Sequence, residues 1–233
     1  MKTKIIKVFL LVGLLTGVAI ASERPGGGQA KGETMEAAIV LPAPDTRGRV
    51  TLEQALAQRQ SHRQFQDRPL TLAEVSQVLW AAQGVTAPRG RRTAPSAGAT
   101  YPLETYLVAG QVDGLRAGVY RYEGSGHRLV QIQPGDLRAA LSAAGLGQRM
   151  LATAPATVVL AAIYQRTAAR YGERARRYVH MEIGHAGQNI YLQAVALGLG
   201  TCAVGAFREE EVAELLRLDG LEPLYIFPVG VRE

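Results

Sequence analysis

Two arginines and a serine near residue 60 could bind a phosphate group. Arg59 and Arg63 stand four positions apart, and Ser61 lies between them. If the segment is helical, both guanidinium groups share one face, where they can make charge-assisted hydrogen bonds to a dianion while Ser61 adds a short donor. The alternative is a solvated helix end, and the spacing alone does not separate the two interpretations.

Two further segments could approach a flat ligand closely. Residues 94–102 place small side chains between Pro95 and Pro102, which favours a rigid and open backbone. Residues 201–207 are mostly small around Gly205, so the end of a strand there would leave backbone N–H groups free to face a ligand. Each of these signals is weak by itself.

Other patterns resemble functional motifs but lack the order or spacing that those motifs require. Residues 198–200 read Gly-Leu-Gly, but the order around them is helix then strand, the reverse of a dinucleotide fingerprint. His180 and His185 are five positions apart, whereas a helical zinc pair needs four. The single cysteine, Cys202, excludes an internal disulfide framework and a cysteine-rich metal site. The sequence therefore predicts no metal site.

Composition limits the class of protein. The chain has 233 residues, of which 47% are hydrophobic and 20% charged, as in one globular domain with a tail. The formal net charge is +6, and the three lysines of residues 1–21 supply half of it. A net charge this small argues against a dedicated nucleic-acid binder.

The N-terminus has the pattern of an export signal. Lys2, Lys4 and Lys7 precede an uncharged apolar run over residues 8–20, and Ala21 ends a small-residue cleavage motif. The run is shorter than the roughly 20 residues of a membrane span. We therefore expect a cleaved signal peptide or an N-terminal anchor over residues 1–21, and a location outside the cytoplasm; a buried first helix is the alternative.

Residues 22–49 are rich in glycine and proline, so we expect a flexible linker there and a folded domain over residues 50–233. Capping boxes at Thr51 and Thr71 predict two helix starts. Helices are expected over 51–60, 71–83, 135–144, 174–197 and 209–216, strands over 104–109, 118–122, 128–132, 157–164, 201–207 and 224–229, and a loop over 85–100. The mixture, with strands in hairpin order, favours an α+β fold.

The helix expected over 174–197 carries apolar or small residues around much of its circumference, including Met181, Gly184 and Gly187. A helix of this kind is buried on most sides, and in a small chain this suggests a second subunit. The alternative is a central core helix in a monomer.

Taken together and in this order, these segments resemble the flavin-dependent nitroreductase family. Within it the chain is similar to the SagB-type and McbC-like dehydrogenases, some of which oxidise azoline rings during peptide maturation. The resemblance covers about residues 50–233 and rests on residues 59–65, 95–104, 118–122, 181–189 and 198–201. It implies a nitroreductase-like α+β fold, with a mainly antiparallel central sheet flanked by helices and a long central helix at a homodimer interface.

The resemblance also implies FMN bound between two subunits. Arg59, Ser61 and Arg63 would hold the phosphate, and Arg232, near the C-terminus, is a further basic candidate. The ring would be lined by Pro95, Ser96, Ala97 and Gly98 from the partner subunit, and its N5 edge would face Val204, Gly205 and Ala206.

One departure from the family bears on the reaction. The azoline-oxidising relatives carry a Lys-Tyr pair before the long helix, and here Tyr171 is kept while the lysine is replaced by Arg170. Arginine stays protonated near neutral pH and cannot act as a base, which argues against azoline oxidation. Tyr171 and Arg170 are nevertheless the side-chain candidates for a catalytic role.

We therefore expect an FMN-dependent oxidoreductase that uses NAD(P)H or another donor and a small conjugated acceptor, of nitroaromatic or quinone type. The alternatives are a dehydrogenase of a peptide-borne azoline ring and a non-catalytic flavin-binding domain. Free NAD(P)H is not expected outside the cytoplasm, so the export signal conflicts with the usual donor.

Overall fold

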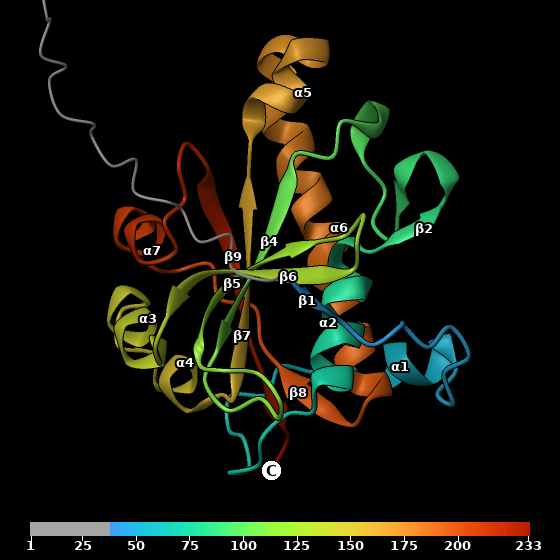
Figure 1. The fold of residues 1–233 in the computed structure, drawn as a ribbon. Helices are drawn as coiled ribbons and strands as arrows, with labels where there is room; N and C mark the ends of the chain where they lie inside the picture. Colours follow the sequence, from blue (N-terminus) through green and yellow to red (C-terminus); the bar gives the residue numbers. More distant parts are fainter. Residues whose placement is uncertain (1–37) are drawn as a thin grey trace, which may run out of the picture. The chain divides into compact units, whose positions relative to one another are not determined.

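An antiparallel sheet organises the chain (Figure 1). The computed structural model describes residues 38–233, so the expected signal segment and the first part of the expected linker lie outside the described residues. The strands of the main sheet are β1 (Ile39–Val40), β4 (Leu103–Ala109), β5 (Gly118–Glu123), β6 (Arg128–Pro134), β7 (Ala156–Ala162), β8 (Leu199–Thr201) and β9 (Glu222–Val231). Their order is β1-β6-β5-β4-β7-β9-β8, and every neighbouring pair is antiparallel. The predicted α+β class with a mainly antiparallel sheet is confirmed.

Helices cover both faces of this sheet. They are α1 (Leu52–Gln58), α2 (Leu72–Gln83), α3 (Arg138–Ala144), α4 (Arg149–Thr153), α5 (Tyr164–Tyr171), α6 (Ala175–Ala196) and α7 (Glu209–Leu215). Single turns of 3-10 helix lie at Pro88–Gly90, Ala97–Ala99 and Gly172–Arg174, and a small hairpin joins β2 (Val85–Ala87) to β3 (Arg91–Arg92).

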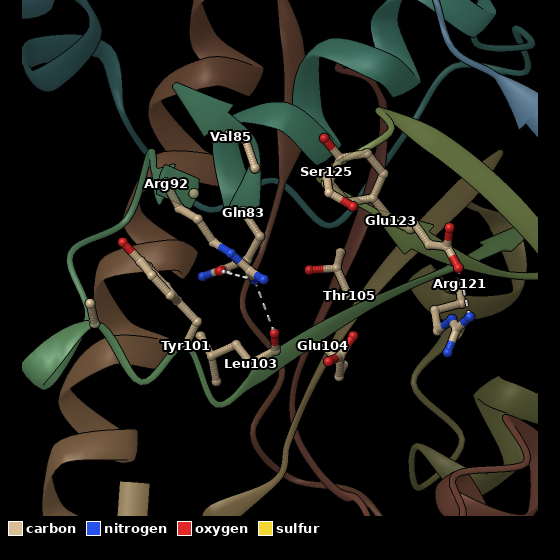
Figure 2. Close-up of a pocket in the computed structure, with 14 residues that line it drawn as sticks. Gln83, Val85, Arg92, Tyr101, Leu103, Glu104, Thr105, Arg121, Glu123 and Ser125 are labelled. Carbon is tan, nitrogen blue, oxygen red and sulfur yellow. Dashed lines mark hydrogen bonds and ion pairs between the residues drawn. The ribbon is translucent and has the colours of Figure 1, made fainter. Parts of the chain in front are cut away.

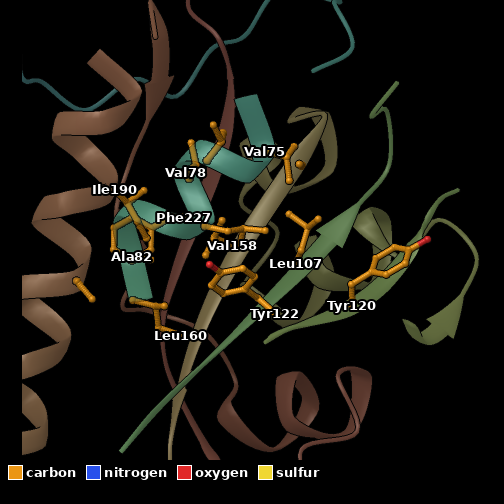
Figure 3. Packing of buried hydrophobic residues seen from close by; sticks show 14 of the residues in the cluster. Val75, Val78, Ala82, Leu107, Tyr120, Tyr122, Val158, Leu160, Ile190 and Phe227 are labelled. Atoms are coloured by element: carbon orange, nitrogen blue, oxygen red, sulfur yellow. The ribbon is translucent and has the colours of Figure 1, made fainter. Parts of the chain in front are cut away.

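The two faces of the sheet bury separate cores. On one face, Leu107, Val158 and Phe227 pack against α2 and α6 (Figure 3). On the other face, their sequence neighbours Val108 and Val159 pack with residues of α3, α4 and α7. Successive side chains of a strand point to opposite faces, which explains this division. β7 is buried along its whole length, which explains why its sequence is apolar at every position but Thr157 rather than alternating.

Both predicted capping boxes are present. The Gln54 N–H donates to the Thr51 hydroxyl at 3.2 Å and the Thr51 N–H donates to the Gln54 side chain at 2.9 Å. At the start of α2 the matching distances between Thr71 and Glu74 are 3.2 and 2.7 Å. Caps of this kind stabilise a helix by about 0.5–2 kcal/mol each. The long helix α6 also lies where the sequence predicts it, ending before Gly198, whose φ is 72°.

Several expectations about single elements are wrong. Of the strand expected over 201–207, only Thr201 lies in a strand, at the end of β8 on the sheet edge; beyond it Val204 makes an isolated bridge to Ile226. The reason is local, because the Ala203 N–H is bonded to the Tyr191 hydroxyl instead of a strand. The loop expected over 85–100 contains the β2–β3 hairpin, and α4 and α5 were not predicted.

The described part of the expected linker packs on the sheet. β1 pairs with β6, and Leu41 is only 4% exposed. The Asp45 N–H donates to the Gln77 side chain of α2 at 2.9 Å. Residues 39–41 and Asp45 therefore pack on the domain, although its start was expected at residue 50. Among the helices of residues 38–233, none has the length and apolarity needed to cross a bilayer.

Candidate functional site

The segment after α1 is extended, not helical. α1 ends at Gln58, and Arg59 has φ −61° and ψ 119°. The His62 N–H donates to the Thr201 carbonyl at 2.9 Å, and Phe65 forms a bridge with Arg232. The conditional helical arrangement of Arg59 and Arg63 is therefore wrong, because backbone bonds to β8 and to the end of β9 hold this segment along the sheet edge.

This extended segment still borders a cavity. Ser61, His62, Arg63, Gln64 and Glu233 line a space of about 440 Å³. The His62 Nε2 atom is buried there without a hydrogen-bond partner. Burial, and secondarily the charge of Arg232, lower the pKa of His62, so a second guanidinium acts on the same site. A hydroxyl, an unpartnered imidazole nitrogen and two arginine charges fit a phosphate, although Glu233 adds a carboxylate at the rim.

Tyr191 of α6 joins this segment to the one after β8. Its hydroxyl lies 2.8 Å from the Ser61 hydroxyl and accepts the Ala203 N–H at 2.8 Å. The Arg59 guanidinium lies over the ring, 5.1 Å from its centroid, in a cation–π contact. The segment of residues 59–63 and the segment after β8 were predicted as separate candidates, and they meet at the Tyr191 side chain. Sequence reasoning counted Tyr191 only as an apolar helix position; the hydroxyl was the missed signal.

Replacing Tyr191 by phenylalanine should lower the free energy of unfolding by about 1–2 kcal/mol, because the half-buried Ala203 N–H loses its acceptor. Urea denaturation measures this change. Tyr178→Phe is the matched control on the same helix, because Tyr178 contacts Tyr171 through its ring, which phenylalanine keeps. Equal stability of Tyr191→Phe and Tyr178→Phe would contradict the structural role of the bridge.

The turn of residues 204–206, which follows Ala203, includes exposed backbone. Val204 is 3% exposed and exchanges two backbone hydrogen bonds with Ile226, at 2.8 and 3.1 Å. Gly205 and Ala206 follow it and are exposed. The nearest atom to a Cβ built on Gly205 would be on Tyr225, 3.8 Å away. Val204 therefore anchors the turn, and the next two residues are free to face a ligand.

The expected ring-lining segment, residues 95–98, lies elsewhere on the molecule. Gly98, Ala99 and Tyr101 have φ values of 57°, 55° and 44°, a region that costs energy for residues other than glycine. The Ser96 hydroxyl accepts the Tyr101 N–H at 2.9 Å and so holds this bend. Strained backbone of this kind gathers at ligand sites.

Arg170 and Tyr171 pack directly on this bend. Arg170 Nη1 donates to the Gly98 carbonyl at 3.4 Å. A Cβ on Gly98 would lie 2.6 Å from the Tyr171 hydroxyl and 2.9 Å from Arg170 Cδ, so both side chains lie directly against this glycine. The two side chains suggested for catalysis thus border the platform of residues 95–98.

Glu182 of α6 contacts the same bend through its side chain. It is 2% exposed, its Oε1 atom has no partner, and its carboxylate accepts a hydrogen bond from Ser96. Burial raises the pKa of Glu182 to about 7, against the opposing effects of the Ser96 bond and the Arg92 charge. Sequence reasoning missed this residue. An acid between Val179 and Ile183, on the buried face of a helix, was the signal that could have found it.

The two groups of site residues contact different parts of α6. Glu182 and Tyr191 are nine residues apart, which is about 14 Å along a helix axis. Within the described residues, the phosphate segment and the 203–206 turn meet at Tyr191, whereas residues 95–98 do not join them. No group of metal-ligating side chains occurs within residues 38–233.

Comparison with known proteins gives a consistent result. Residues 56–231 match the sequence model of the nitroreductase family. A protein of Methanocaldococcus jannaschii whose name assigns it to the nitroreductases is 47% identical over 199 residues, which are 85% of this chain and 98% of that protein. A Ralstonia eutropha crystal structure with the same assignment has 29% identity and a TM-score of 0.73, covering 86% of this chain and 91% of that one.

Two more distant structures share the fold. A chain of the E. coli microcin synthetase McbBCD complex, solved with truncated pro-MccB17 bound, has 24% identity and a TM-score of 0.64, covering 91% of this chain and 84% of that one. The NADPH:FMN oxidoreductase of Vibrio harveyi, complexed with NAD⁺, has 18% identity and a TM-score of 0.56, covering 78% and 68%. At these identities the similarity establishes the fold alone.

Proposed function

The chain belongs to the nitroreductase family, and from this premise we propose that it is an FMN-dependent oxidoreductase. Electrons would pass from NAD(P)H or another donor to a small conjugated acceptor, of nitroaromatic or quinone type. The observation that carries the proposal is the meeting of Ser61, Arg59 and the Ala203 N–H at Tyr191. When bound, FMN supplies the hydride chemistry, and the protein supplies position and electrostatics.

In this proposal, different residues bind the phosphate and the ring of FMN. Ser61 and Arg63 would hold the phosphate in their cavity, with Arg232 adding positive charge and Arg59 stacked at the rim. Gly205 and Ala206 would offer backbone N–H donors to the ring edge. In this proposal residues 95–98 line the ring from a second subunit, with Arg170 and Tyr171 behind them.

A homodimer is part of the proposal, and α6 provides a surface for it. Arg177, Met181, Gly184 and Gln188 are exposed at helical spacing and form one stripe. Met181 is 48% exposed, and a Cβ built on Gly184 would meet no atom within 4 Å. A second helix could therefore approach closely here.

The experiment that tests the proposal is the visible spectrum of the purified chain, recorded without added flavin and then with NADPH under anaerobic conditions. We expect a yellow protein that bleaches on reduction. A yellow protein that keeps its colour would indicate another donor, as export through residues 1–21 would require, or a flavin-binding role without this reaction. A colourless protein that takes up no added FMN would contradict the proposal.

The dehydrogenation of a peptide-borne azoline ring is the second candidate. Tyr171, against Gly98, favours it, whereas Arg170 in place of a lysine opposes it. Mass spectrometry of a heterocyclised peptide incubated with the protein tests this candidate, because the reaction removes two hydrogen atoms from the ring and so lowers the peptide mass.

A further inference from the structure

A second cavity lies between the end of α2, the β2–β3 hairpin and strand β4 (Figure 2). Its volume is about 480 Å³, within the range of small-molecule sites. The turn after β5 closes one wall, since a Cβ on Gly124 would lie only 2.9 Å from the Gln83 carbonyl oxygen. None of the residues assigned above to the phosphate, the ring or the catalytic pair lines this space.

Three residues of the lining carry buried polar atoms without partners. Gln83 and Thr105 are each 2% exposed, and neither the Gln83 Nε2 nor the Thr105 hydroxyl has a hydrogen-bond partner. The buried Nε of Arg121, further along the wall, is also unpartnered. Buried polar groups are nearly always satisfied in proteins, and leaving one unpaired costs about 1–3 kcal/mol. Three such atoms in one lining indicate a space that a polar ligand completes.

The two carboxylates and the Gln83 side-chain oxygen of the same lining are already paired. Glu104 pairs with Arg166 at 2.6 Å, and Glu123 pairs with Arg121 at 2.7 Å and with Arg128 at 2.6 Å. The side-chain oxygen of Gln83 accepts from Arg92 Nη1 at 2.9 Å. The cavity therefore offers donors and positive charge, and its own carboxylates are neutralised.

The remaining wall is apolar and aromatic. Leu103 is fully buried at the base, and the Tyr101 ring lies under the Arg92 guanidinium, 4.9 Å from its centroid. In Figure 2 the polar ends of Gln83, Arg92 and Thr105 point toward one another across the cavity. A ligand that fits has acceptor oxygens at this point and an apolar body beside Tyr101 and Leu103.

We propose that this cavity binds a carboxylate with an apolar or aromatic body, through Gln83, Thr105 and Arg92. A carboxylate is anionic and accepts several hydrogen bonds in one plane, which matches two N–H donors and a hydroxyl. The carboxylate belongs either to a free organic acid or to the C-terminus of a peptide. The proposal does not rest on the proposed flavin chemistry, because none of the residues assigned to the phosphate, the ring or the catalytic pair lines the cavity.

Calorimetric titration of the full chain with benzoate tests the proposal, with benzamide as the uncharged analogue. We expect benzoate to bind and benzamide to bind at least about tenfold more weakly, because a charged acceptor strengthens each hydrogen bond. An N-acetylated dipeptide with a free C-terminus, compared with its amide, distinguishes the two sources of carboxylate. Failure of every carboxylate to bind would overturn the proposal, whether or not the protein holds FMN.

Thr105→Val should weaken benzoate binding by about fivefold to tenfold, the loss of one hydrogen bond. Thr157→Val is the matched control, because Thr157 on β7 is fully buried with an equally unpartnered hydroxyl and does not line the cavity. Gln83→Glu keeps the acceptor for Arg92 but replaces the free donor by a carboxylate, and it should abolish binding. Unchanged affinity in Thr105→Val and Gln83→Glu would refute the assignment.

Discussion

Replacing Arg59 and Arg63 together with alanine should leave a folded protein that no longer retains FMN. Arg63 lines the proposed phosphate cavity, and the Arg59 guanidinium stacks on the neighbouring Tyr191 ring. In this proposal each makes a charge-assisted hydrogen bond to the phosphate, and such bonds contribute about 1.5–3 kcal/mol. The loss of both predicts an affinity at least about a hundredfold lower. The flavin-to-protein absorbance ratio after desalting measures retention, and titration with FMN measures the dissociation constant.

The control for this variant removes the same charge elsewhere. Arg47 and Arg49 are exposed, and neither lines the cavity of residues 61–64. Arg47→Ala/Arg49→Ala should retain flavin as the unaltered chain does, and circular dichroism should show both variants folded. Full flavin occupancy in Arg59→Ala/Arg63→Ala would refute the phosphate assignment while leaving the family membership intact.

The elements that the sequence predicted best are those fixed by nearby residues. The capping boxes at Thr51 and Thr71 form because each joins groups three positions apart. The long helix α6 was also found, since its pattern extends over 22 residues and ends at a glycine with positive φ. Local chemistry decides these boundaries, so the sequence displays them directly.

The candidate site was predicted in its residues but not in its arrangement. Arg59 and Ser61 were identified by type, yet their extended geometry depends on the Thr201 carbonyl and the Tyr191 hydroxyl, more than a hundred residues away. The carboxylate cavity was not foreseen at all. Gln83 and Thr105 are ordinary residues of a helix and a strand, and only the folded chain leaves their polar atoms without partners.

Glu182 carries the second large expected effect, because it is an acid buried beneath the platform of residues 95–98. One carboxylate oxygen is bonded to Ser96 and the other has no partner, so ionisation in the folded state is poorly compensated. Burial therefore raises the pKa of Glu182 from an unfolded value of 4.5 to about 7. Below pH 4.5 the group is protonated in both states and has no effect on stability.

Between pH 4.5 and 7 the unfolded chain releases this proton and the folded chain keeps it, so the free energy of unfolding should fall as pH rises. The full shift corresponds to about 3 kcal/mol of stability lost by pH 8. Glu182→Gln has the same shape, can still bond Ser96 and cannot ionise. Urea denaturation at a series of pH values should show equal stability at pH 4 and a variant more stable by about 3 kcal/mol at pH 8.

The control, Glu214→Gln, changes an exposed glutamate and should leave the pH profile as it is in the unaltered chain. Parallel profiles for Glu182→Gln and the unaltered chain would contradict a buried, proton-retaining carboxyl. The same titration bears on the site, because ionised Glu182 can only accept hydrogen bonds and protonated Glu182 can also donate one. If the Ser96 bond holds the bend of residues 95–98, the affinity for FMN should change with the same midpoint near pH 7 and should lose that midpoint in Glu182→Gln.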